Sequence, residues 1–366
     1  MEYTKRDSIM VKGLAALCMV CLHLFCRQGT AVFGKPLIWI NDTTPLVFLF
    51  GFFSEICVPL YSMSAGYAQQ LMLENGKLSL KSNAKRIFRL LKIYWIILVL
   101  FSILGLIFDK SGGIPGNIAD FLKSIVLLHS YNGAWWYLNT YIILLLIPYR
   151  FLFGIINKLS TKWGFAFCFC VEAAWYVVSR FNILPNIPDN MVILGFIGKE
   201  LSNLIFVLPY VWAGAILCKW KVVERTRAWY KEHIQDKYYN LVVLLALTVL
   251  FIAINLIHKF VLTGTSAVIT FILFNLLKKP KPVESCFLVL GKHSTVIWLT
   301  HMFFYMYLFK GLVFIARYPL LILLFMLFLC IITSYIVRAI EWCINNLYTL
   351  IIAKKGKCKE SENAVC

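Results

Sequence analysis

A lysine and a histidine lie eleven residues apart inside the apolar segment VKGLAALCMVCLHLF, which begins at Val11. Eleven residues make about three helical turns, so Lys12 and His23 would lie within roughly 20° of one helix face and about 16 Å apart along the axis. Ionisable groups inside a membrane helix are costly and are functional-site hypotheses by default. A neutral imidazole can take a proton from a hydroxyl near neutral pH. The alternative is a lysine that reaches the interface beside a histidine that only packs in the bundle.

A second group of basic residues lies in the segment KRIFRLLKIYW, at residues 85–95. Arg86 and Arg89 are neighbours on one helix face, with Lys85 and Lys92 beside them. A guanidinium binds a phosphate through two N–H groups, so this pair could hold a phosphorylated cosubstrate. Alternatively, these residues only anchor the cytoplasmic end of a membrane span.

Other polar residues within apolar segments include Glu55, His293, Ser294 and His301. Each of them alone is more often a packing residue than a catalyst. The run Cys18, Cys21, His23 and Cys26 has metal-ligating side chains. One helix cannot place four ligands around an ion, so we expect no metal. Arg338 and Glu341 have the spacing of an ion pair within one helix.

Composition identifies the elements that must position these side chains. The 366 residues are 61% hydrophobic and only 14% charged, which is typical of an integral membrane protein. We predict an all-α fold, a single bundle of about ten transmembrane helices. Residues 1–353 would form the transmembrane domain and 354–366 a basic cytoplasmic tail. The predicted spans are 9–27, 45–73, 87–108, 135–155, 163–180, 200–218, 239–258, 260–277, 287–309 and 318–341.

The formal net charge of +19 is distributed as the positive-inside rule requires. Most lysines and arginines fall in alternate polar segments, beginning with the N-terminal one, which predicts that both termini are cytoplasmic. This arrangement argues against a nucleic-acid partner and favours contact with anionic membrane lipids. The first span contains His23 and lacks a small-x-small cleavage site, so we do not expect a cleaved signal peptide.

Six segments, taken in order, resemble the acyltransferase-3 family of polytopic membrane acyltransferases. The spacing from Lys12 to His23 is similar to the family's basic-residue-x10-histidine pattern. The remaining matches are EICVPLYSMSAGY, KRIFRLLKIYW, WWYLN at 135–139, LPYVWAGAIL at 208–217 and LGKHSTVIWLTH at 290–301. Four positions depart from the family pattern: Lys12 replaces the commoner arginine, Ala65 a serine, Ile93 a frequent proline and Trp298 the usual tyrosine.

The resemblance implies a cytoplasmic acyl-CoA donor, usually acetyl-CoA, and an acceptor hydroxyl on a glycan or lipid-linked sugar. Carried over to this chain, it makes His23 the catalytic base, and Arg86 and Arg89 the partners of the CoA phosphates. Lys12, His301 and Ser294 would have supporting roles.

The same resemblance favours a multi-pass protein of the bacterial plasma membrane. Because Lys12 and His23 lie at different depths, we expect a tunnel that is basic at its inner end. Tyr94, Trp136 and His301 would line it near His23, with Tyr94 and Trp136 contacting the cosubstrate.

Two other functions remain open from the sequence. A proton-coupled transporter or flippase could use His23, Glu55 and His301 as a relay, although the sequence contains no repeat of the kind that many transporters have. A membrane sensor or export partner without catalytic activity is the third candidate.

Overall fold

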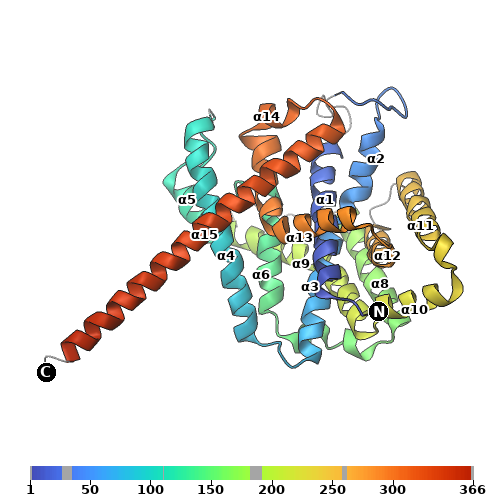
Figure 1. Ribbon diagram of the computed structural model, residues 1–366, viewed down its shortest axis with the longest axis horizontal. Helices are drawn as coiled ribbons and strands as arrows, with labels where there is room; N and C mark the ends of the chain where they lie inside the picture. The colour runs from blue at the N-terminus through green and yellow to red at the C-terminus, as the bar shows by residue number, and fades with distance from the viewer. Residues whose placement is uncertain (1, 27–34, 110, 182–191, 258–261, 364–366) are drawn as a thin grey trace.

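The computed structural model describes residues 2–26, 35–109, 111–181, 192–257 and 262–363, and within them every regular element is a helix (Figure 1). Apolar segments form helices in a membrane because a helix satisfies its backbone hydrogen bonds internally. The main elements are α1 (Lys5–Phe25), α2 (Leu46–Phe53), η2 (Ser54–Ile56), α3 (Cys57–Glu74), α4 (Leu80–Phe108), α5 (Ile118–Ile125), η3 (Gly133–Trp135), α6 (Trp136–Leu146), α7 (Tyr149–Phe153), α8 (Thr161–Arg180), α9 (Val192–Lys219), α10 (Val222–His233), α11 (Asp236–Ile257), α12 (Thr263–Leu276), α13 (Lys281–Met302), η6 (Phe303–Tyr307), α14 (Lys310–Phe314) and α15 (Pro319–Asn363).

Six helical segments among the described residues are long and apolar enough to cross a membrane: Lys5–Phe25, Leu46–Glu74, Leu80–Phe108, Ile193–Lys219, Asp236–Ile257 and Pro319–Leu347. They correspond to six of the predicted spans, and the protein is a multi-pass helical membrane protein. The predicted spans 163–180 and 287–309 coincide with α8 and α13, which are not among the six. Residues 27, 258, 260 and 261 of the predicted spans lie outside the described residues. The count of ten and the cytoplasmic termini stay predictions.

The predicted span 135–155 is wrong as a continuous helix. Helix α6 ends at Leu146, Ile147 is extended with ψ of 125°, and α7 begins only at Tyr149. The break follows from Pro148, which disfavours helical geometry in the preceding residue and has no N–H for the helical ladder. Like α12, the segment Gly133–Leu146 is a shorter apolar helix.

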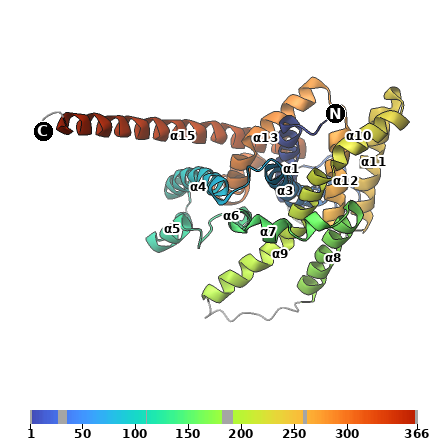
Figure 2. The ribbon, with the colours of Figure 1, turned by 90° about the horizontal axis from the view of Figure 1, so that it is seen from below.

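Helices α1 and α13 pack in parallel through two glycines. A Cβ atom at Gly13 would lie 2.1 Å from the Phe287 carbonyl oxygen, and one at Gly291 would lie 1.9 Å from that of Ile9. Only the missing side chains allow this approach, as is common between membrane helices. Helices α3 and α9 use Gly66 in the same way. Figure 2 shows α1 and α3 surrounded by α9, α12 and α13.

Charged residues hold the beginning of α1 in place. Thr4 and Asp7 form a capping box, in which each side chain accepts a hydrogen bond from the backbone of the other residue. Asp7 also pairs with Arg227 of α10 at 3.3 Å. Arg6 pairs with Glu284 of α13 at 2.6 Å. These contacts connect α1 to both neighbours at the end opposite His23.

Helix α15 extends well beyond the other helices in both views (Figures 1 and 2). Residues 354–363, predicted as a tail, continue this helix, and residues 364–366 lie outside the described residues. The predicted pair between Arg338 and Glu341 is not formed. Glu341 instead pairs with Lys92 of α4 at 2.7 Å, and Arg338 donates to the Lys292 carbonyl oxygen.

Candidate active site

The histidines at the ends of α1 and α13 lie side by side. His23 and His301 have ring centroids 4.9 Å apart, with 40° between their planes. Each follows one of the two contact glycines by ten residues, so the parallel packing of the helices carries both rings to the same level. The Tyr305 ring lies 6.3 Å from His23 and 6.2 Å from His301. Tyr305 belongs to the π-helical segment η6, an irregularity that is frequent at functional sites.

Hydrogen bonding determines the tautomer of a neutral His301. Its Nδ1 lies 2.8 Å from the Trp298 carbonyl oxygen and 3.2 Å from that of Ile297. A carbonyl oxygen only accepts, so Nδ1 carries the proton and Nε2 presents a lone pair. His301 is completely buried, and Nε2 has no hydrogen-bond partner within the described part of the chain. An acceptor of this kind beside His23 can hold an N–H group in place.

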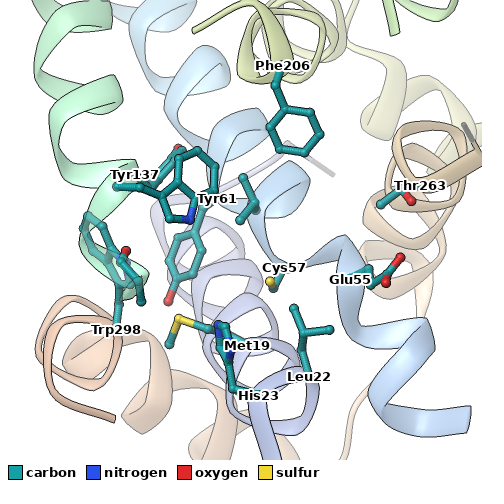
Figure 3. Close-up of a pocket in the computed structure, with 13 residues that line it drawn as sticks. Met19, Leu22, His23, Glu55, Cys57, Tyr61, Tyr137, Phe206, Thr263 and Trp298 are labelled. Atoms are coloured by element: carbon teal, nitrogen blue, oxygen red, sulfur yellow. The ribbon is translucent and has the colours of Figure 1, made fainter. Parts of the chain in front are cut away.

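His23 lines a cavity of about 280 Å³ (Figure 3). Helix α1 forms one wall, the segment from η2 to α3 the next, and α6, α9, α12 and α13 the others. The lining is mostly aromatic and apolar, and among the described residues His23 is its one imidazole and Glu55 its one carboxylate. It consists of Met19, Leu22, His23, Glu55, Cys57, Val58, Tyr61, Ala134, Trp136, Tyr137, Phe206, Thr263 and Trp298. A space with so few polar groups would contain little water.

Tyr61 is a candidate hydrogen-bond donor in this cavity. Figure 3 shows its ring reaching across the cavity toward Met19 and His23. The Tyr61 hydroxyl is buried and makes no hydrogen bond to the described residues. Ser294, which we predicted to support His23, lies close to this hydroxyl, but its own hydroxyl donates to the Gly291 carbonyl oxygen at 2.9 Å. Tyr61 is therefore the better placed of the two to donate a hydrogen bond.

The basic residues lie away from this cavity. Lys12 and Arg86 lie close enough for their charges to interact, and Arg86 also contacts Met72 Sδ. Arg89 is exposed, so the two arginines of the motif face different surroundings. Neither arginine lines the cavity, and neither does Lys12. The structure thus brings Lys12 together with Arg86 as a cationic pair and leaves Arg89 outside it.

The tunnel expected between this cationic pair and His23 stays a prediction, since the cavity lining includes neither Lys12 nor Arg86. The charge of Arg86 acts on Tyr141, whose ring stacks 6.2 Å from that of Tyr137, and Tyr137 lines the cavity. Tyr137 is in turn hydrogen-bonded to Ser62 at 3.0 Å. Tyr141 and Tyr137 thus form a chain of contacts from Arg86 to the wall of the cavity.

Of the two aromatic residues expected near His23, Trp136 lines its cavity and Tyr94 does not. The Tyr94 hydroxyl donates to the Ser124 carbonyl oxygen at 2.7 Å, and the Tyr94 ring packs edge-on against Trp135. Whether Tyr94 lies near His23 stays a prediction. Ser124 lies in the last turn of α5, which presents its carbonyl oxygen to Tyr94 of α4.

Sequence reasoning did not select two residues of the cavity, Tyr61 and Tyr137. Tyr61 lies within the segment EICVPLYSMSAGY that carried the resemblance, and Tyr137 is the third residue of WWYLN. A polar aromatic residue in each of two matched segments was the available signal. Glu55, which we considered only as part of a relay, also lines the cavity. No group of three His, Cys, Asp or Glu side chains among the described residues could hold a metal ion.

Comparison with known proteins gives one match. Residues 8–339 match the acyltransferase-3 family, which is described as an acyltransferase domain. No curated protein and no solved structure matches the chain. The match covers nearly the whole chain and includes both histidines of the pair.

Proposed function

The chain belongs to the acyltransferase-3 family, and from this premise we propose that it transfers an acyl group, most simply acetyl, from cytoplasmic acyl-CoA to a hydroxyl of a surface or exported glycan. The observation that carries the proposal is the position of His23, which lines a mostly apolar cavity and has the buried acceptor His301 Nε2 beside it. The family match itself supports a membrane acyltransferase. The acetyl group, the glycan and the role of His23 are our additions.

In the proposed reaction, neutral His23 removes the proton from the acceptor hydroxyl as its oxygen attacks the thioester carbonyl carbon. The resulting tetrahedral intermediate carries a negative oxygen, which the Tyr61 hydroxyl could stabilise by donating a hydrogen bond. Cleavage of the C–S bond then forms the ester and releases CoA thiolate, which takes the proton back from the His23 imidazolium. The few polar groups of the cavity would also limit hydrolysis of the thioester.

The donor would approach from the end of α1 at which Lys12 and Arg86 lie. Two cations there have no carboxylate paired with them among the described residues, and CoA phosphates provide the missing charge. A long, narrow pantetheine arm suits the distance of about 16 Å between the levels of Lys12 and His23. Movement of Tyr137 and Tyr141 would then admit the thioester to the cavity.

The same residues also suit a proton relay, which keeps transport as a second candidate. Glu55 and His23 line one cavity, and His301 lies beside His23. A relay predicts proton flux across proteoliposomes without any acyl-CoA. Acyl transfer instead requires acyl-CoA and leaves an ester on the acceptor.

Comparison of surface glycans from cells with and without this protein tests the proposal. We expect an alkali-labile acyl ester that is present only when the wild-type chain is expressed. Restoration of that ester by His23→Ala protein, at normal abundance in the membrane, would refute the assignment of His23 as the base.

A further inference from the structure

We propose that a second site, between α5, α6 and α9, binds the acceptor as an amphiphile, with an apolar tail in one chamber and a sugar head group in the next. The inference rests on the proposed acyl transfer at His23 and adds a binding site for the acceptor and its route of entry. Two adjoining cavities and one buried glutamate carry it.

The first chamber is apolar and reaches the outer surface of the bundle. It has a volume of about 420 Å³ and lies between the turn after α5 and helices α6 and α9. Leu128, Ile197 and Leu201 line it and are 58%, 55% and 54% exposed. In a membrane protein, such exposed apolar side chains face lipid tails. A hydrocarbon chain could therefore enter this chamber sideways from the bilayer.

The second chamber is more polar and continues the first. It has a volume of about 240 Å³ and shares part of its wall with the apolar chamber, including Leu127, Asn139 and Glu200. Its other lining residues include His129, Ser130 and Lys199, with the rings of Tyr94, Trp135 and Trp136. Aromatic rings next to hydrogen-bonding groups suit a molecule that has both C–H faces and hydroxyls. Sugars have this combination.

Glu200 lies where the two chambers meet, and one of its two carboxyl oxygens has no hydrogen-bond partner among the described residues. The residue is 6% exposed. Its Oε1 accepts a hydrogen bond of 3.2 Å from Asn139 Nδ2, and Asn139 also donates to the Leu127 carbonyl oxygen at 3.2 Å. Oε2 is buried and has no partner among the described residues. A buried carboxyl oxygen without a partner is costly, and a ligand hydroxyl would remove that cost.

The polar chamber adjoins the proposed active site through one side chain. Trp136 lines both this chamber and the cavity that contains His23. The Phe206 ring, which lies on the His23 side, is 6.1 Å from Trp136. A head group held by Glu200 is thus one indole ring away from the base. A rotation of Trp136 would bring a hydroxyl of the head group to His23.

Binding of short glycolipids to the protein in lipid nanodiscs tests this site without requiring catalysis. The probes are dodecyl glucoside and dodecyl N-acetylglucosaminide, with methyl glucoside and dodecanol as the head-only and tail-only compounds. Thermal unfolding gives the concentration of each probe at half-maximal stabilisation. We expect stabilisation by at least one dodecyl glycoside, and none of that size from the head-only or tail-only compounds.

Two substitutions test the contributions of the two chambers separately. Glu200→Gln removes the carboxyl acceptor and should weaken glycoside binding about tenfold or more. Leu201→Trp should fill the apolar chamber and abolish binding. Leu194→Trp is the matched control, because Leu194 lies two turns away on α9 and is also 54% exposed, but lines neither chamber. The control should bind as the wild type does.

Three results would overturn the proposal. One is the absence of stabilisation by either dodecyl glycoside. The others are equal stabilisation by dodecanol or methyl glucoside, and equal loss of binding in the Leu194 control. His23→Ala protein should still bind the glycoside, so failure of this site and failure of the proposed catalysis give different results.

Discussion

The imidazole rings of His23 and His301 lie 4.9 Å apart because two helices touch at glycines ten residues before each ring. Gly13 and Gly291 permit backbone contact between α1 and α13. Because the two helices run in parallel, residues ten positions after each glycine lie at the same height along the helix pair. The pair is thus a consequence of helix packing. It also connects the stability of the bundle to the geometry of the proposed active site.

Replacement of His23 by alanine should abolish acyl transfer, because no other described residue of its cavity is a histidine. The loss of one polar group from an apolar helix should leave membrane insertion intact. The measurement is ester formation from labelled acetyl-CoA in membranes with matched protein abundance. His293→Ala is the control, since His293 is hydrogen-bonded to Ser334 and lies outside the cavity, and it should remain active.

His301 should act by positioning His23, and its replacement should lower kcat more than it changes KM. A lost hydrogen bond to a charged group costs about 1.5–3 kcal/mol, which is roughly a ten- to hundredfold lower rate. His301→Gln retains a side-chain acceptor and should keep more activity than His301→Ala. The pH–rate profile should shift in His301→Ala, because the ring that lies beside His23 and its Nε2 lone pair are removed. An unchanged profile with normal kcat would contradict this role.

Arg86→Ala should weaken acyl-CoA binding about tenfold or more, through the loss of a charge-assisted phosphate contact. Arg89→Ala should also weaken donor binding, but less, because Arg89 is exposed and lies apart from Lys12. Lys85→Ala provides an exposed cation from the same segment as the control. CoA affinity of the purified protein is the measurement, and equal affinity in all three variants would leave these residues as membrane anchors.

Gly291→Ala should destabilise the protein and reduce acyl transfer together. The added Cβ would lie 1.9 Å from the Ile9 carbonyl oxygen, so α1 and α13 must separate. Overpacking of this kind costs about 1–3 kcal/mol. Gly195→Ala is the control, because no atom lies within 4 Å of a Cβ there. Thermal unfolding in detergent should show a lower Tm for the first variant only.

The sequence predicted the helical membrane fold and six of the spans. These predictions rest on hydropathy and on helical periodicity, which act locally. The break at Pro148 was also readable from the sequence, since proline acts on its own and the preceding residue. The prediction of a continuous span there gave too much weight to hydropathy.

Only the tertiary structure decided which side chains of neighbouring helices contact one another. Arg338 and Glu341 have suitable spacing for a pair, yet Glu341 pairs with Lys92 of α4 and Arg338 donates to the Lys292 carbonyl oxygen. Tyr94 shares a motif with Arg86, yet its hydroxyl bonds Ser124 of α5 and it does not line the His23 cavity. Residues on one helix can face different neighbours, and the periodicity of one helix does not say which neighbour each face will meet.

The sequence by itself determined which residues have chemistry unusual for a membrane helix: Lys12, His23, Arg86 and His301. Their cost in an apolar setting makes them recognisable without a structure. Only the tertiary structure decided that His301 presents a lone pair beside His23, that Tyr61 and Tyr137 line the cavity of His23, and that Glu200 is buried with one unpaired oxygen. The physical reason is that these properties belong to contacts between helices, which depend on packing and are absent from any single segment.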